Sequence, residues 1–200
     1  MAGASFAEAV LATRNAGKIR ELESLLAESL GPVRVLSAAD AGLPDVVEDG
    51  TTFAENALLK ARSAAAHSEL PAFADDSGLA VDVMNGAPGI FSARWSGVHG
   101  DDAANNALLL AQLADVPDAH RGAAFVCAAA FVAPDGTEVV REGRFTGTLL
   151  REPRGEDGFG YDPLFLPDGS SLTAGEMGPA RKNAISHRAL AFRALLGVIA

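Results

Sequence analysis

The sequence predicts an α/β or α+β domain, because short apolar runs rich in Val, Leu and Phe alternate with segments of helical periodicity. Of the 200 residues, 48% are hydrophobic and 21% are charged, so a hydrophobic core can form without disulfides or structural metals. No linker, low-complexity segment or internal repeat divides the chain. We therefore expect a single domain over residues 1–200.

The N-terminal region predicts a strand, a helix and a second strand. Residues 9–12 form a short apolar run that is typical of a buried strand. From about Gly17, apolar residues recur with helical spacing and charged residues occupy the opposite face, and Gly31-Pro32 ends this helix. Residues 33–36 are the next expected strand.

A capping box defines the start of the second helix. Thr52 and Glu55 are spaced so that each side chain can accept a hydrogen bond from the backbone N–H of the other. The helix is expected to continue to about His67. Two short strands are expected after it, over residues 71–74 and 79–83.

The second half of the chain predicts two further helices and a hairpin. A helix over about 102–114 begins with acidic residues, which the helix dipole favours. Two apolar runs, 125–133 and 137–145, flank a Pro-Asp-Gly turn and indicate a hairpin. The last helix is expected to start near Ser186. Residues 147–167 are rich in Gly and Pro and lack periodicity, as functional loops often do.

Charge and cysteine content limit the partners and the compartment. The formal net charge of −10 disfavours general binding of DNA or RNA, but it does not exclude a small phosphorylated ligand. The only cysteine, Cys127, lies in an apolar run, so a buried structural thiol in a reducing compartment is expected. We expect a cytoplasmic protein without a membrane span or secretory signal.

Residues 13–18 link the first strand to the first helix and form a candidate anion site. A helix N-terminus offers backbone N–H groups and the positive end of the dipole, and Lys18 adds a charge. The segment is not a Walker A loop, because Ala12 replaces its first Gly and Ile19 replaces its Ser or Thr. Any metal therefore needs other ligands. An ordinary capped helix start is an equally weighted alternative.

Asp75 and Asp76 are candidate metal ligands or acid–base groups. Carboxylates are ionised at neutral pH and bind hard cations, and one member of a close pair can accept a proton. Adjacent residues of an extended chain point to opposite sides, so one Asp would face a ligand while the other braces the loop. A turn stabilised by these side chains is the alternative. Glu48 precedes the capped helix and Lys60 lies on it, where Lys60 shares a face with Asn56 that could form the wall of a cleft. The alternative is that both are solvated surface charges.

Residues 159–162, Phe-Gly-Tyr-Asp, are a candidate base-binding loop. An aromatic ring beside glycine can stack on a nucleobase, although a hydrophobic plug that closes the sheet is an equal alternative. Further along, Lys182, His187 and Arg188 gather two cations and an imidazole around one helix start. No G-x-S-x-G elbow is present, so the pattern of a Ser–His–Asp hydrolase is absent.

Five stretches carry a resemblance that covers nearly the whole chain: LATRNAGKIRELESLL, EDGTTFAENALLKA, FADDSGLAVDVMNGAPGIFSARWSG, EPRGEDGFGYDPLF and KNAISHRALA. Together and in this order they resemble the Ham1-like inosine/xanthosine triphosphate pyrophosphatases. The resemblance implies an α/β fold with a long twisted mixed sheet flanked by helices, and two lobes around a central substrate cleft. It also implies hydrolysis of ITP, dITP or XTP to the monophosphate and pyrophosphate, dependence on Mg²⁺ with Mn²⁺ as a substitute, and a homodimer.

The resemblance also implies a role for each matching residue. Asp76 would be the proton acceptor, with Asp75, Lys18 and Glu48 as further catalytic residues, and Glu48 and Asp76 would hold the metal. The phosphates would be bound by Thr13, Arg14, Asn15, Ala16, Gly17, Lys18 and Lys60. The base and sugar would be bound by Ser77, Phe159, Gly160, Tyr161, Asp162, Lys182, His187 and Arg188. Gly175 and Gly178 depart from the family by loosening a segment that is usually more helical.

Base selectivity has a simple expected origin in hydrogen-bond donors. A buried donor such as Arg188 is satisfied by the 6-carbonyl of hypoxanthine or xanthine and is left facing the amino group of adenine. Two other interpretations remain beside this one. They are a Maf-like pyrophosphatase with another base preference, such as dTTP or UTP, and a nucleotide-binding sensor that does not hydrolyse. Retention of Glu48, Asp75, Asp76 and Lys18 together argues against the sensor.

Overall fold

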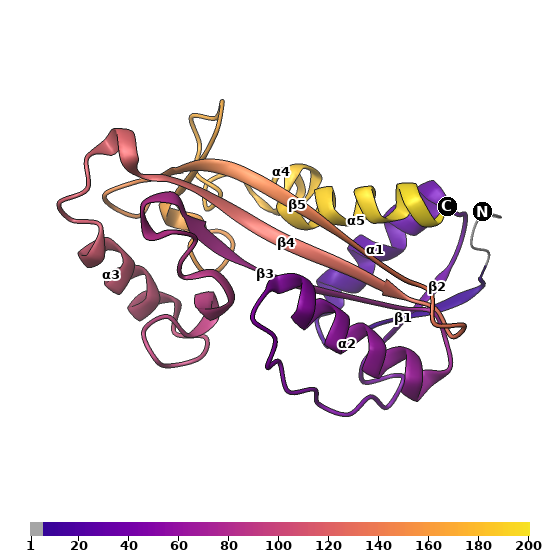
Figure 1. Ribbon diagram of the computed structural model, residues 1–200. Coiled ribbons are helices and arrows are strands. Elements are labelled where there is room, and N and C mark those ends of the chain that lie inside the picture. The colour runs from indigo at the N-terminus through magenta and orange to yellow at the C-terminus, as the bar shows by residue number, and fades with distance from the viewer. Residues whose placement is uncertain (1–5) are drawn as a thin grey trace. The chain divides into compact units, whose positions relative to one another are not determined.

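The computed structural model describes residues 6–200 and contains a six-stranded sheet with the strand order β2-β1-β3-β4-β5-β6 (Figure 1). The strands are β1 Glu8–Leu11, β2 Arg34–Ser37, β3 Ala72–Val81, β4 Gly122–Val132, β5 Glu138–Leu149 and β6 Phe165–Pro167. β1 pairs in parallel with both β2 and β3, whereas β6 pairs antiparallel with β5. The sheet is therefore mixed, as predicted.

The helices occur where the sequence predicts them, with one addition. They are α1 Ala16–Ser29, α2 Phe53–Ser68, α3 Asp102–Gln112, α4 Pro179–Ile185 and α5 His187–Ile199, with short 3-10 turns at residues 82–84, 89–94, 118–120 and 162–164. α2 begins at the predicted capping box, in which Thr52 Oγ1 accepts from the N–H of Glu55 at 3.1 Å. α4 is the addition, and Gly178, with a φ of +72°, precedes its first residue. In the described part of the chain, every helix is too short or too polar to cross a membrane.

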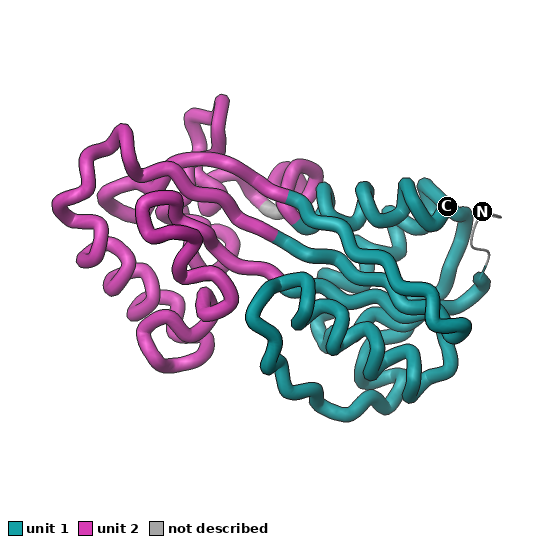
Figure 2. Tube along the Cα trace, in the orientation of Figure 1, with its two compact units in different colours: residues 1–76, 127–143, 188–200 teal, residues 77–126, 144–187 magenta. Residues whose placement is uncertain are grey.

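The chain divides into two compact units (Figure 2). Unit 1 comprises residues 1–76, 127–143 and 188–200, and unit 2 comprises residues 77–126 and 144–187. β3, β4 and β5 each contribute residues to both units. The single domain and the substrate cleft that the resemblance implies stay predictions.

Unit 1 has helices on both faces of its strands. Leu22 of α1 and Phe192 of α5 pack with Leu11, Phe73 and Phe131 on one face, and all five side chains are buried. Alternate residues of the same strands, together with the alanines of α2, form the core of the other face. Successive residues of a strand therefore alternate between the face that α1 and α5 cover and the face that α2 covers.

Unit 2 is built around the remaining halves of β3, β4 and β5. Leu79, Leu109 and Phe125 lie in its core, where the rings of Phe125 and Phe165 meet edge to face at 4.8 Å between centroids. Arg121 is buried, and its guanidinium donates to three backbone carbonyls, those of Leu113, Leu149 and Leu150.

The largest difference from the sequence-based expectation lies in β3. Instead of two short strands around a turn at Asp75-Asp76-Ser77-Gly78, the structure has one strand of ten residues, Ala72–Val81. Asp, Ser and Gly have low strand propensity, but tertiary context overrides it, because neighbouring strands and cationic side chains bind this segment. Both carboxylates consequently project from a regular strand.

Candidate active site

The first helix starts with a side-chain cap at Asn15. Asn15 Oδ1 accepts from the N–H groups of Gly17 at 2.8 Å and Lys18 at 3.3 Å. The N–H of Asn15 in turn donates to Thr13 Oγ1 at 3.2 Å. The capped-start interpretation is therefore correct for this structure, and a phosphate would have to displace these bonds to reach the same N–H groups. Anion binding here stays a prediction.

Asp75 lies buried between two cations in unit 1. Its carboxylate accepts from Lys18 Nζ at 3.1 and 2.8 Å and from Arg188 Nε at 3.1 Å. Burial by itself would raise the pKa of Asp75, but the charges of Lys18 and Arg188 outweigh it and hold that pKa well below its ordinary value. Asp75 therefore stays ionised and is a poor proton acceptor, which suits it to fixing the two cations.

Asp76 faces the opposite side of β3, toward α2. Asn56 Nδ2 donates to Asp76 Oδ2 at 3.1 Å, and Lys60 Nζ lies 3.7 Å from Asp76 Oδ1. The expected alternation is thus confirmed, since Asp75 contacts α1 and α5 residues while Asp76 contacts α2 residues.

Lys60 also joins Asp76 to Glu48. Its Nζ lies 3.1 Å from Glu48 Oε2, so one ammonium group is shared by two carboxylates that are 28 positions apart in the chain. The two acidic residues that the resemblance assigns to a metal are therefore brought to the same place. The contact between them runs through a cation.

The donor set fits a magnesium ion that is completed by other ligands. Mg²⁺ prefers oxygen ligands and is commonly held by one or two carboxylates, with waters and substrate phosphates filling the other positions. Glu48 and Asp76 supply two such carboxylates. Among residues 6–200, no group of three or more His, Cys, Asp or Glu side chains is arranged around a common metal position.

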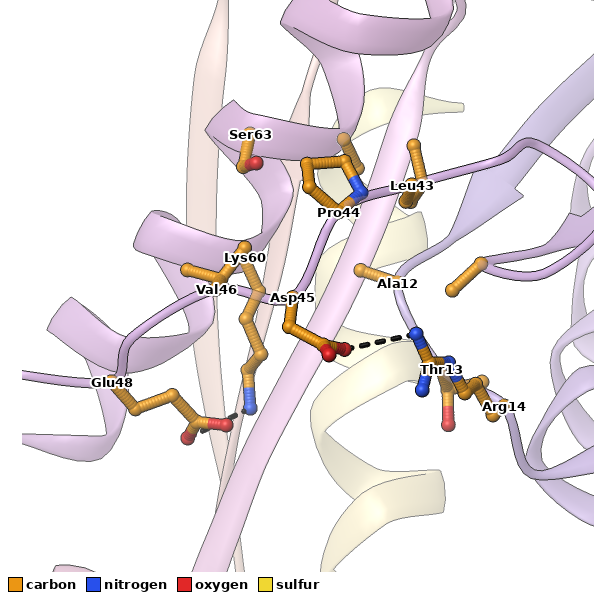
Figure 3. A pocket seen from close by; sticks show the side chains of 12 residues that line it. Ala12, Thr13, Arg14, Leu43, Pro44, Asp45, Val46, Glu48, Lys60 and Ser63 are labelled. Carbon is orange, nitrogen blue, oxygen red and sulfur yellow. Dashed lines mark ion pairs between the residues drawn. The ribbon is translucent and has the colours of Figure 1, made fainter.

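A cavity of about 350 Å³ opens beside these residues within unit 1 (Figure 3). Thr13, Arg14, Glu48 and Lys60 line it, together with residues of the 43–46 loop. Figure 3 shows Lys60 pointing to Glu48, and Arg14 pointing to Asp45, with which it pairs at 2.9 Å. Two cations thus border one cavity, and each is paired with a carboxylate of the same wall.

Asn56 is a site residue that the sequence reasoning did not assign. Besides donating to Asp76, its Oδ1 accepts from the N–H of Gly50 at 2.9 Å, so this buried amide ties the acidic loop to β3. A Cβ on Gly50 would lie 2.6 Å from Asn56 Oδ1, which explains the need for glycine there. The signal was the four-residue spacing of Asn56 and Lys60 on one helix face.

Unit 2 holds a second cavity, of about 120 Å³, with an aromatic and apolar lining. The predicted base-side residues that border it are Ser77, Phe159, Gly160, Tyr161, Asp162, Lys182 and His187. Lys182 forms a buried ion pair with Asp162, and its Nζ lies 4.6 Å from the centroid of the Phe159 ring. The His187 ring stacks on Phe125 with 5.2 Å between centroids.

The two aromatic residues of the 159–162 loop have opposite environments. Tyr161 is buried, and its hydroxyl donates to the carbonyl of Ser92 at 2.9 Å. Burial raises the pKa of Tyr161, which keeps that hydroxyl protonated. The Phe159 ring is 66% exposed. The plug interpretation therefore describes Tyr161, whereas Phe159 is largely exposed, with Lys182 Nζ over its ring.

Arg188 belongs to unit 1, whereas the other residues that the resemblance implies for the base belong to unit 2. Besides its bond to Asp75, its guanidinium approaches Glu21 Oε2 at 3.9 Å. It is not among the residues that line the unit 2 cavity. Its assignment to the base pocket stays a prediction.

Comparison with known proteins decides the family. The model of the Ham1 family matches residues 9–198. The chain belongs to the Ham1 family. A Streptomyces coelicolor protein named dITP/XTP pyrophosphatase is 61% identical over 192 residues, which cover 95% of this chain and 96% of that protein. A Nocardia farcinica protein of the same name is 56% identical and covers 98% of this chain and 96% of its own length.

Solved structures of Ham1 proteins share the fold. A Mycobacterium abscessus dITP/XTP pyrophosphatase has a TM-score of 0.78 at 51% identity, over 96% of this chain and 98% of that one. A HAM1 protein from Coxiella burnetii has a TM-score of 0.88 at 40% identity, over 97% and 98%. All candidate residues of this Ham1 chain lie inside the matched range.

Cys127 takes no part in the candidate site of this Ham1 chain. The thiol is free and buried, and burial raises its pKa far above the ordinary value. The predicted structural role is therefore confirmed.

Proposed function

We propose that this Ham1 protein hydrolyses the deaminated purine nucleotides dITP, ITP and XTP to the nucleoside monophosphate and pyrophosphate. The observation that carries the proposal is the meeting of Glu48 and Asp76 at one cation, Lys60, beside a cavity that Arg14, Lys60 and Glu48 line. The names of the Streptomyces and Nocardia relatives support the same substrates.

The charged residues of unit 1 would act on the triphosphate. Glu48 and Asp76 would hold Mg²⁺, or Mn²⁺ in its place, and the bound ion would supply charge neutralisation at the phosphate oxygens. Asp76 accepts the proton of a water whose oxygen bonds to the α-phosphorus. The bond from that phosphorus to the bridging oxygen breaks, and pyrophosphate leaves with its charge offset by Lys18.

Asp75 serves this step indirectly. By binding Lys18 through both carboxylate oxygens, Asp75 fixes the position of the ammonium group. An ion held in a preorganised geometry stabilises developing charge without having to reorient. Asp75 thus orients a charge, and Asp76 handles the proton.

The cavity of unit 2 would bind the base. The exposed face of Phe159 offers a stacking surface, and Lys182, Asp162 and His187 supply polar groups at the walls. An apolar lining with few polar groups favours a flat heterocycle whose edge matches those groups. This division assigns phosphate chemistry to unit 1 and base recognition to unit 2.

We further propose that the protein works as a cytoplasmic homodimer without a nucleic-acid partner. The net charge of −10 supports the absence of a nucleic-acid partner, and the free buried thiol supports a reducing compartment such as the cytoplasm. Light scattering on the purified chain tests the dimer, which a monomer mass would contradict. Retention of the protein on a DNA column at 150 mM salt would contradict the absence of a nucleic-acid partner.

The substrate class is tested by a panel of rates. Pyrophosphate release is measured with Mg²⁺ for dITP, XTP, GTP, ATP and dTTP under identical conditions. We expect dITP and XTP to be hydrolysed at least about a hundredfold faster, in kcat/KM, than ATP. A preference for dTTP would favour the Maf-like alternative. Binding of dITP without pyrophosphate release would favour the sensor.

A further inference from the structure

Two side chains of α3 form hydrogen bonds with the backbone of Gly160. Asp102 Oδ2 accepts from the N–H of Gly160 at 2.6 Å. Asn106 Nδ2 donates to the carbonyl oxygen of Gly160 at 2.8 Å. Asp102 and Asn106 are four positions apart and so project from the same helix face, one turn from each other. Both polar groups of a single glycine are therefore held by one helix.

The backbone conformation of Gly160 determines where the side chains of Phe159 and Tyr161 point. Gly160 has a φ of +62°, in the left-handed region, and no atom lies within 4 Å of where a Cβ would stand. Glycine is therefore needed there for its backbone conformation and not for lack of space. The turn at this residue sends the Tyr161 ring into the core and leaves the Phe159 ring at the cavity.

Phe159 also contacts Asp162 and Lys182. Its N–H donates to Asp162 Oδ2 at 2.9 Å, and Lys182 lies over its ring. The backbone of Phe159 is thus fixed by the hydrogen bond of its own N–H and by the hydrogen bonds of Gly160, whereas its side chain is largely exposed. The position of the ring depends on hydrogen bonds to its backbone.

We propose that Asp102 and Asn106 are positioning residues that hold the Phe159 ring where a purine base stacks. The inference rests on the proposed function, in which this cavity takes the base. Asn106 Oδ1 is buried and has no hydrogen-bond partner among residues 6–200, so within these residues the side-chain amide of Asn106 bonds through its Nδ2 to Gly160. A buried acceptor without a partner lowers stability, and such a cost is typical of a residue that is kept for function.

The test compares Asn106→Leu with a matched control on the same helix. Leucine has nearly the shape of asparagine and removes only the donor to Gly160. Gln112→Leu is the control, because Gln112 Oε1 accepts from Trp95 Nε1 at 2.8 Å and lies outside both cavities. Thermal unfolding of both variants is recorded first. Asp102→Ala serves as a second variant that removes the other hydrogen bond to Gly160, although Asp102 also lines the unit 2 cavity and Asn106→Leu therefore decides the outcome.

Three measurements follow on each protein: steady-state hydrolysis of dITP, binding of IMP by calorimetry, and inhibition by inorganic tripolyphosphate, which lacks a base. For Asn106→Leu we expect KM for dITP and Kd for IMP to rise at least about fivefold, the lower end of a lost stacking contact. We expect kcat to stay within about twofold and tripolyphosphate inhibition to be unchanged. Gln112→Leu should match the wild type.

The outcomes separate this inference from the proposed function. Unchanged IMP binding in a folded Asn106→Leu protein would overturn the positioning role, and so would equal weakening of IMP and tripolyphosphate. A wild-type protein that releases no pyrophosphate from dITP would contradict the proposed function instead. In that case the change in IMP affinity between wild type and Asn106→Leu still decides the positioning role, and a wild type that does not bind IMP overturns it.

Discussion

The candidate residues of the two units are held in place by different forces. In unit 1, Asp75 and Asp76 on the same strand are bound by cationic and amide side chains that come from α1, α2 and α5. In unit 2, aromatic rings border the cavity, and the backbone of Gly160 is fixed by hydrogen bonds from α3. Ion pairs hold most of the first group, whereas aromatic packing and hydrogen bonds to one glycine hold the second, beside a single ion pair, Lys182–Asp162.

This difference matches the two ends of a nucleoside triphosphate. A triphosphate is recognised by charge and by positioned cations, and such contacts are sensitive to salt and to removal of one partner. A base is recognised by stacking and by a few directional hydrogen bonds in an apolar wall. Substitutions in unit 1 should therefore affect turnover and stability, whereas those in unit 2 should affect affinity for the base.

The largest effect is expected from Asp76→Asn in unit 1. The amide cannot accept the proton of water and is a weaker ligand for a divalent ion, so kcat should fall about 10²–10⁴-fold or more. The measurement is pyrophosphate release from dITP at saturating Mg²⁺, with circular dichroism to verify the fold. Glu142→Gln, at an exposed position of β5 in the same unit, is the control. Unaltered turnover of Asp76→Asn would refute its role.

Asp75→Asn should mainly affect stability. Removing one partner of a buried ion pair leaves Lys18 and Arg188 without their counter-charge, and we expect a loss of about 3–5 kcal/mol in the free energy of unfolding. Urea denaturation measures it. Because the pKa of Asp75 is lowered in the folded state, its contribution is fully present above the ordinary aspartate pKa.

The lowered pKa of Asp75 also determines how the stability of the protein changes with pH. The stability difference between wild type and Asp75→Asn should be constant from pH 8 to pH 5 and should shrink only as the pH falls further toward the lowered pKa. A difference that grows in acid would contradict the ion-pair assignment of Asp75.

Arg188→Ala tests which of the two groups this arginine serves. The resemblance implies that it lies in the base pocket, and the structure shows it bound to Asp75 in unit 1. If it reads the base, the ratio of kcat/KM for ITP over ATP should fall by about five- to a hundredfold, the value of a lost buried hydrogen bond. An unchanged ratio together with lower stability would place its whole effect in the Asp75 cluster.

A smaller effect is expected for Phe159→Ala in unit 2. Loss of a stacking ring should raise KM for dITP about 5- to 150-fold, with kcat changed little. Phe91→Ala is a matched control, since Phe91 is also exposed and also lies near a cation, Arg94, at 5.3 Å. Equal kinetics of the two variants would contradict base stacking on Phe159.

The sequence predicts most of what is local in this protein. The capping box at Thr52 and Glu55, the opposite directions of Asp75 and Asp76, and the buried state of Cys127 all follow from neighbouring residues or local patterns. The continuity of β3 was missed, because strand propensity reports the segment alone and not its partners in the sheet.

Contacts over long distances in the chain could not be predicted. One example is Lys60, which pairs with both Glu48 and Asp76. Another is the pair of hydrogen bonds between α3 and Gly160. In both cases no sequence spacing relates the residues that meet. The resemblance supplied the roles of Glu48 and Asp76, but it did not indicate Asn56, Asp102 or Asn106. The sequence signal for Asn56 is its four-residue spacing from Lys60, whereas Asp102 and Asn106 become evident only from their contacts with Gly160 in the structure.

In the proposed function, the charged residues of unit 1 direct water to the innermost phosphate. Hydrolysis of dITP in water enriched in oxygen-18, followed by phosphorus NMR of the products, tests this step. We expect dIMP and pyrophosphate, with the heavy oxygen on the phosphorus of dIMP. Label in pyrophosphate, or release of dIDP with labelled inorganic phosphate, would contradict it.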